Sequence, residues 1–167
     1  RGQWIRLDKT LKSLAQYADY PDDVKSLLGE MFAAVTMVAD NLKFSGAVSL
    51  QSKGDGALTR SLAECRDQHY LRGIAHVATD KAADIRSSNL ADWLGNGQLA
   101  LSLLPDKSTR MNPYQGLVEI DPAGLAASLE GYFQNSEQLQ TRLHFASLDG
   151  TTTGLLLQRL PDAPEAS

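Results

Sequence analysis

A stretch of helical periodicity from Pro21 to Leu42 constrains the fold most, because its middle turns have no polar face. A helix on the surface of a protein keeps one face polar. We therefore predict a helix about 30 Å long that other elements cover on more than one side. The apolar residues of this stretch are Val24, Leu27, Leu28, Met31, Phe32, Ala33, Ala34, Val35, Met37, Val38 and Leu42.

Pro21, Asp22 and Asp23 mark the start of this helix. Proline suits the first helical position, and the two carboxylates lie at the positive end of the helix dipole. Most of the remaining chain alternates between apolar and polar residues, which is typical of half-buried strands. The strands that we expect cover residues 2–8, 44–52, 57–65, 69–77, 98–104, 114–120, 141–147 and 154–160.

Two shorter helices complete the prediction. One covers about residues 11–17, with Asp8 or Thr10 as its cap, and the other opens with Asp121 as cap and Pro122 as first residue. Residues 80–89 form a polar loop or a short helix. Most neighbouring strands are joined by connections too short for parallel pairing. The pattern therefore predicts an α+β fold rich in antiparallel strands, rather than a doubly wound α/β fold.

Two glycine-rich segments resemble phosphate-binding loops: "KGDG" at 53–56 and "LGNGQLA" at 94–100. A phosphate-binding loop leads from a strand into a helix whose first amides point at the anion. Each of these segments leads instead into a strand-like run. Asp-Gly between two alternating runs favours a hairpin, so we expect both segments to be turns.

Composition excludes several classes of protein. The 167 residues carry a net charge of −4, with Lys and Arg scattered along the chain. That distribution argues against nucleic-acid binding, which needs concentrated positive charge. No apolar run reaches the roughly 18 residues of a membrane-spanning helix, and no signal peptide is recognisable. The single cysteine excludes an internal disulfide and a four-cysteine zinc site within the chain, and favours a reducing compartment.

The pair Cys65 and His69 is the arrangement that most suggests catalysis. A catalytic thiol needs a nearby base and a lowered pKa, and the segment between the two residues has the character of a turn. We favour the alternative, a small and partly buried side chain at a strand end. His76 and His144 fall inside predicted strands with no acidic or serine motif beside them. The residues alone therefore indicate a globular domain without an active site, and an inert structural role stays open.

Several motifs occur in an order and spacing that resemble a known family. The most telling are "LKFSG" followed by "GDG" (42–56) and "YF" followed by "SEQLQTRL" (132–143). Together the motifs resemble the N-terminal core of the redox-regulated bacterial chaperone family called heat-shock protein 33, from residue 1 to about 161. Gln140 stands where that family usually has a proline, which leaves the resemblance intact. The other motifs are "RGQWIRL" (1–7), "YPDDVKSLLGEMFAAVTMVADN" (20–41), "LRGIAHV" (71–77), "GNGQLALSL" (95–103), "YQGLVEI" (114–120) and "GLLLQRLP" (154–161).

The resemblance implies a fold and a function. The fold is an α+β core with apolar helices packed between sheet layers. The function is that of a cytoplasmic, ATP-independent holdase, which binds unfolded client proteins and prevents their aggregation. In the family, four thiolates of a C-terminal module bind zinc in reducing conditions and keep the chaperone inactive. Oxidation forms disulfides, expels zinc, uncovers apolar surface and favours dimers. Zinc is thus expected in a module outside this chain, and no cofactor within it.

We accordingly expect residues 1–161 to form the chaperone core and residues 162–167 to begin a linker, as parts of a longer protein. Client binding would rest on exposed apolar surface. The candidate residues are Phe145, Leu156 and Leu160, on strand faces near the tail. We expect a homodimer, no enzymatic activity, and neither nucleic acid nor a membrane as partner. A thiol enzyme that uses Cys65 with His69 is the alternative.

Overall fold

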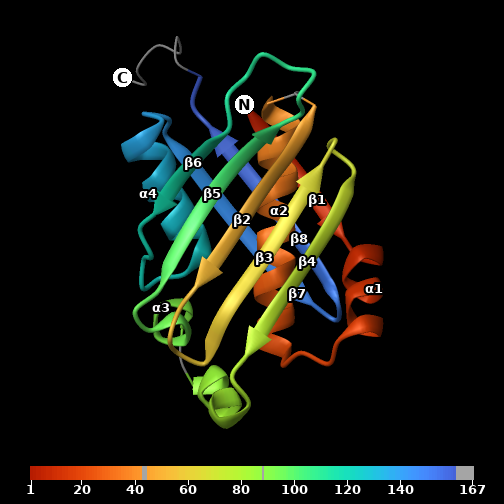
Figure 1. Cartoon of the computed structure of the whole chain (residues 1–167), viewed down its shortest axis with the longest axis vertical. Helices are drawn as coiled ribbons and strands as arrows, with labels where there is room; N and C mark the ends of the chain where they lie inside the picture. The colour runs from red at the N-terminus through yellow and green to blue at the C-terminus, as the bar shows by residue number, and fades with distance from the viewer. Residues whose placement is uncertain (43–44, 88, 161–167) are drawn as a thin grey trace.

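The computed structural model describes residues 1–42, 45–87 and 89–160 and places α2 (Asp22–Leu42) between two antiparallel sheets (Figure 1). The large sheet has the strand order β4-β3-β2-β5-β6, and the small sheet has the order β1-β8-β7. This confirms the predicted α+β fold with a helix buried between sheet layers. The strands are β1 (Gly2–Leu7), β2 (Gly46–Lys53), β3 (Leu58–Arg66), β4 (Tyr70–Val77), β5 (Gln98–Pro105), β6 (Tyr114–Val118), β7 (Thr141–Leu148) and β8 (Thr151–Gln158).

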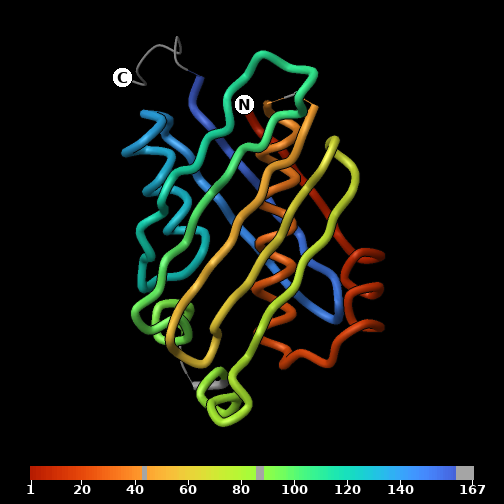
Figure 2. Tube along the Cα trace, in the orientation of Figure 1, coloured from red at the N-terminus to blue at the C-terminus, as the bar shows by residue number. Residues whose placement is uncertain are grey.

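Three further helices lie around these layers. They are α1 (Lys9–Tyr17), α3 (Leu90–Leu94) and α4 (Leu125–Ser136), and a 3₁₀ segment covers Thr79–Ser87. The trace in Figure 2 shows α1, in red, and α4, in blue, on opposite sides of the molecule. The first predicted helix is therefore confirmed, with Asp8 as the cap whose Oδ1 accepts the Lys9 backbone N–H at 2.6 Å. Of the predicted strand 44–52, residue 44 lies outside the described residues.

The helix α2 is buried because both sheets pack against it at close range. On the side of the large sheet, a Cβ at Gly73 of β4 would lie 2.6 Å from Cζ of Phe32. On the side of the small sheet, a Cβ at Gly29 would overlap the side chain of Thr152. The two glycines thus let α2 and the sheets approach closely on two faces of the helix. Cover on more than one side is what the absence of a polar face in the sequence predicted.

The predicted start of α4 is wrong by three residues. Asp121 does not cap the helix, because its Oδ1 accepts the backbone N–H of Ala123 at 2.8 Å and closes a local turn. The helix begins only after this turn, at Leu125. Strand β8 also begins three residues before its predicted start, at Thr151. Asp149 and Gly150 form a two-residue hairpin loop with positive φ values of 50° and 75°, so pairing resumes at once.

The two glycine-rich segments are turns, as predicted, and they bind each other. Leu94 O accepts the backbone N–H of Asp55 at 2.9 Å and that of Gly56 at 3.1 Å. In return, Asp55 Oδ1 accepts the Asn96 backbone N–H at 2.8 Å, and Oδ2 accepts the Asn96 side-chain amide at 2.9 Å. These bonds from Asn96 hold the pKa of the Asp55 carboxyl below its usual range. They tie the β2–β3 turn to the start of β5.

Substituting Gly54 by alanine is expected to lower the free energy of unfolding by about 1–3 kcal/mol. The new Cβ would overlap the Leu94 carbonyl oxygen, a backbone atom that cannot move without opening the turn. Gly131→Ala is the matched control. Gly131 lies inside α4 with nothing within 4 Å of its Cβ position, so helix propensity alone should raise the free energy of unfolding by about 0.5–1 kcal/mol. Urea titration measures the free energy of unfolding of both variants. A change of the same sign in the two variants would contradict the expectation.

Candidate functional site

The outer face of the small sheet carries an exposed row of apolar side chains. Because Leu156 is buried against the core and the strands alternate, Leu155 and Leu157 point away from α2. Trp4 of β1 lies directly opposite Leu155 in the register. Trp4 is 68% exposed and Leu157 is 47% exposed. We call Trp4, Leu155 and Leu157 the apolar row.

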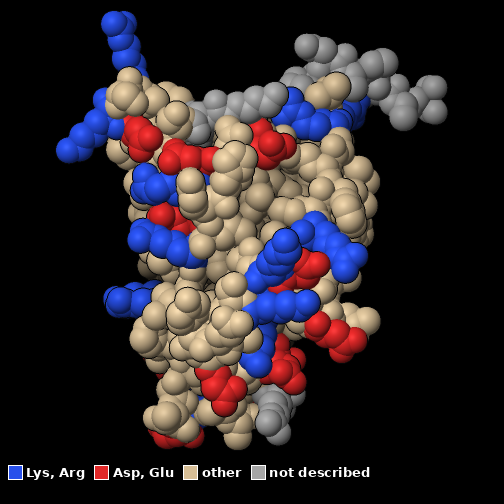
Figure 3. Space-filling view, turned by 90° about the vertical axis from the view of Figure 1, so that its right-hand side faces the viewer, with Lys and Arg blue, Asp and Glu red and all other residues tan. Residues whose placement is uncertain are grey.

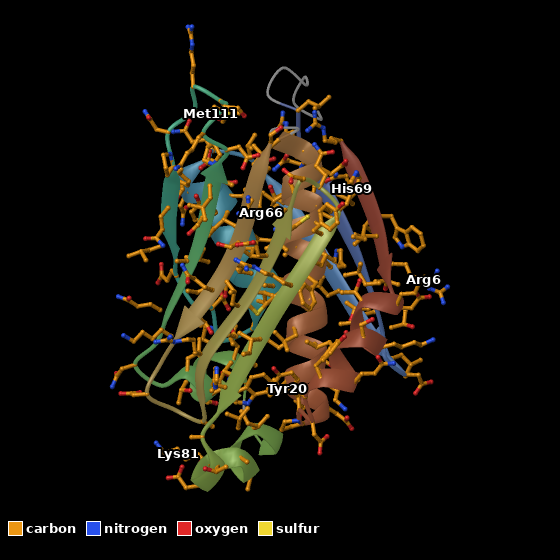
Figure 4. The ribbon with its side chains drawn as sticks, turned by 45° about the vertical axis from the view of Figure 1, so that its right-hand side comes forward. Arg6, Tyr20, Arg66, His69, Lys81 and Met111 are labelled. Atoms are coloured by element: carbon orange, nitrogen blue, oxygen red, sulfur yellow. The ribbon has the colours of Figure 1, made fainter. Side chains whose placement is uncertain are left out.

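Charged residues border the apolar row, and acidic neighbours hold them in place. Arg6 lies 3.8 Å from Asp8, and Arg142 lies 3.3 Å from Glu130 of α4. Figure 4 shows Arg6 at the outer side of β1, directed away from the layers. The apolar row is thus a solvent-exposed apolar strip with paired charges at its rim, the composition that marks interaction surfaces on soluble proteins.

The outer face of the large sheet is more polar across its middle. Glu64, on β3 beside the central strand β2, accepts from Arg72 Nε at 3.0 Å and lies 3.7 Å from Arg66 Nε. Ser49 and Ser102 continue this polar row across β2 and β5. The next row of this face carries Ile74, Leu62, Gln51, Ala100 and Leu117 in register, so the polar Gln51 interrupts its apolar residues. On the small sheet, by contrast, Trp4 lies directly opposite Leu155 with no polar residue between them.

The three residues predicted for client binding have different positions. Leu160 is 52% exposed just beyond β8, and Phe145 is partly buried against the core. Leu156 is 1% exposed, so its prediction as a surface residue is wrong. The pairing of β8 with β1 and β7 turns Leu156 toward α2 and its two leucine neighbours outward. A role of Phe145 or Leu160 in binding stays a prediction.

Trp4 was missed by the sequence-based selection, although a signal for it existed. In "GQWIRL" the alternation gives Ile5 and Leu7 to one face and Trp4 and Arg6 to the other. The residues that alternate with the buried Leu7 could have been assigned to the outside. Leu155 to Leu157 offered no such signal, because three leucines in succession have no alternation.

Cys65 and His69 do not form a catalytic pair. Cys65 is fully buried on the face of β3 that packs against α2, and burial raises the pKa of its thiol. His69 lies exposed in the turn that leads into β4 (Figure 4). A thiol nucleophile requires exposure and a lowered pKa. The structure removes the basis for the alternative of a thiol enzyme.

No three His, Cys, Asp or Glu side chains among the described residues are grouped so that they could hold a metal ion. The four-thiolate zinc site implied by the resemblance therefore has no counterpart in this part of the chain. His76 and His144 lie exposed in β4 and β7, as strand residues. Within the described ranges, no helix is both long and apolar enough to cross a membrane.

A comparison with protein families decides the affiliation. The family model described as "Hsp33 protein" matches residues 1–167. The chain belongs to the Hsp33 family. Among its Hsp33 relatives, a 33 kDa chaperonin of Shewanella denitrificans is 36% identical over 165 residues, covering 99% of this chain and 55% of that protein. A 33 kDa chaperonin of Histophilus somni is 39% identical over 166 residues, covering 97% and 56% respectively.

A solved structure supports the Hsp33 fold independently of close sequence similarity. The crystal structure of a 33 kDa chaperonin from Thermotoga maritima, a heat-shock protein 33 homologue, superposes with a TM-score of 0.72 at 17% identity. The match covers 93% of this chain and 56% of that chain. The chain thus spans little more than half the length of the Hsp33 relatives it matches.

Proposed function

We propose that the chain is the client-binding core of a cytoplasmic, ATP-independent holdase. The observation that carries this proposal is the apolar row on the small sheet, in a chain of the Hsp33 family whose relatives are named chaperonins. Unfolded proteins expose apolar side chains. Covering these with the apolar row would remove from water two surfaces that otherwise favour aggregation.

Redox control and dimer formation belong to the same proposal. The only cysteine of the chain is buried, so a thiol switch would have to lie in the length that the relatives have beyond this chain. A zinc-bound module there would hold apolar surface of the core covered until oxidation releases it. Phe145 and Leu160 remain candidate contacts outside the apolar row.

Light scattering from a heat-unfolding client protein tests the proposal. The chain in equimolar amount is expected to suppress most of the scattering without oxidant. A double substitution of the apolar row, Trp4→Ser with Leu157→Ser, is expected to require about tenfold more protein for equal suppression, since burial of two large side chains contributes at least ~1.4 kcal/mol.

The control variant carries Tyr17→Ser with Leu117→Ser, two residues that are 87% and 67% exposed but lie away from the apolar row. This control should suppress aggregation like the parent chain. No suppression by the parent would refute the holdase function. Equal losses in both variants would refute the apolar row as its site.

Cys65→Ala should leave suppression of aggregation intact, whereas a thiol enzyme would lose its activity.

A further inference from the structure

The free edge of β1 carries backbone groups that point out of the small sheet. Arg1 and Gln158 exchange two backbone hydrogen bonds of 2.8 Å each. In an antiparallel pair such bonded positions alternate with non-bonded ones. The register therefore directs the N–H and C=O groups of Gln3 and Ile5 toward β8, and those of the residues between and beside them outward. The outward residues are Gly2, Trp4 and Arg6.

Two other edge strands have an outward amide that a side chain occupies. On β4, the Ala75 N–H donates to the Tyr20 hydroxyl at 3.2 Å. On β7, the Leu143 N–H donates to Glu130 Oε1 at 2.8 Å. Among the described residues, no comparable bond reaches the outward groups of β1 or of the fourth edge strand, β6. Proteins usually protect sheet edges against pairing with other chains, so β1 and β6 are the candidates for such pairing, and β1 is the one that carries Trp4 of the apolar row.

The open edge is continuous with the apolar row. Trp4 supplies outward backbone groups and also an exposed ring on the outer face, opposite Leu155. A strand added beside β1 would place every second side chain on the same outer face as Trp4, because side chains alternate across a strand. Backbone bonds would hold any sequence, and the apolar row would favour apolar residues at alternate positions.

We propose that β1 binds an extended segment of an unfolded polypeptide by strand addition. This inference rests on the proposed holdase function and specifies how a client is held. In the bound client segment, apolar residues alternate with polar ones, and an acidic residue lies near them.

The charge of the β1 edge selects this occupant over a second copy of the chain. Arg6 and Lys9 are exposed at one end of the edge and Arg1 at the other, with Asp8 as the acidic neighbour. Figure 3, which faces the side with α1, shows a cluster of blue side chains across the middle of its right half. A second copy paired antiparallel about Trp4 would bring together two edges that each carry three cations and one carboxylate, and this like net charge is unfavourable. An acidic client segment has no such penalty.

Arg6→Pro and Arg6→Thr test the proposal as a matched pair. Proline removes the outward N–H without breaking a bond to β8, whereas threonine removes the same charge and retains the N–H. The probe is a short fluorescein-labelled peptide that alternates valine with threonine and ends in aspartate. By fluorescence anisotropy, Arg6→Pro should weaken binding about tenfold relative to Arg6→Thr. Equal affinities of the two variants, with thermal melting showing both folded, would overturn the proposal.

Amide hydrogen exchange of the parent chain gives a second readout that does not depend on a variant. With saturating peptide, the Trp4 and Arg6 amides should gain protection of at least about tenfold, and the Gln3 and Ile5 amides, already bonded to β8, should not change. Protection of Trp4 and Arg6 without peptide, together with sedimentation as a dimer, would assign the edge to a second copy and overturn the proposal. If Arg6→Pro still suppresses client aggregation like the parent, strand addition fails while the holdase function stands.

Discussion

Replacing Phe32 with alanine is expected to lower the free energy of unfolding by about 3–5 kcal/mol. That is a large part of the ~5–15 kcal/mol by which a domain is stable. The ring is 1% exposed and packs directly on the backbone of β4 at Gly73. Alanine would leave a cavity on the large-sheet side, and a shift of α2 into it would open a gap at the contact between Gly29 and Thr152 on the small-sheet side.

Urea titration checks this expectation, with Tyr17→Ala as the control. Tyr17 is an aromatic residue of α1 that is 87% exposed, so its truncation should change the free energy of unfolding by no more than about 0.5 kcal/mol. The slope of each titration should stay close to that of the parent chain, because each change removes only a small part of the surface exposed on unfolding. A loss below about 1 kcal/mol for Phe32→Ala would show that the layers can close around α2.

The burial of α2 could be predicted from the sequence because its signal is local. Apolar residues on all sides of one helix demand cover on all sides, whatever supplies that cover. The sequence did not tell which element covers which side. Phe32 against β4 and Gly29 against β8 follow from the pairing of strands far apart in the chain, which no local pattern contains.

The candidate site shows the same limit at the level of single residues. The strand at the end of the chain and its hairpin turn were predictable from Asp149 and Gly150. The side on which each leucine of 155–157 lies was not, because the phase of a run without alternation is set by its partners. Leu156 was therefore placed on the surface in error. The mutual bonds between Asp55 and Asn96 were also beyond prediction, since the two turns were recognisable only separately.

Glu30 is a carboxylate in the middle of α2, and its predicted effect on stability depends strongly on pH. Burial raises the pKa of this carboxyl from 4.5 to about 7. Among the described residues, none of the ion pairs of the chain includes Glu30. The folded state therefore favours the protonated form, because charge in a poorly solvated place costs free energy that no partner offsets.

The direction of the pH dependence follows from the two pKa values. Below pH 4.5 the carboxyl is protonated in both the folded and the unfolded chain, and its full contribution to stability is present. Between about pH 4.5 and 7 the unfolded chain loses the proton while the folded chain keeps it, so the free energy of unfolding falls as the pH rises. Above pH 7 the loss is complete, on the order of 3 kcal/mol.

Glu30→Gln should remove this loss, because the neutral amide resembles the protonated carboxyl at every pH. The variant is expected to be more stable than the parent by up to about 3 kcal/mol at pH 8 and nearly equal to it at pH 4. Urea titrations at the two pH values measure the difference. Glu119→Gln, at an exposed position after β6, is the control and should change stability by no more than about 0.5 kcal/mol at either pH. If Glu30→Gln gives the same change at pH 4 and pH 8, the carboxylate is solvated or paired in the folded chain. If Glu30→Gln is more stable than the parent only at high pH, the Glu30 carboxylate is poorly solvated between the layers. Its charge then lowers the stability of the folded chain below the level that the apolar surface of α2 alone would give.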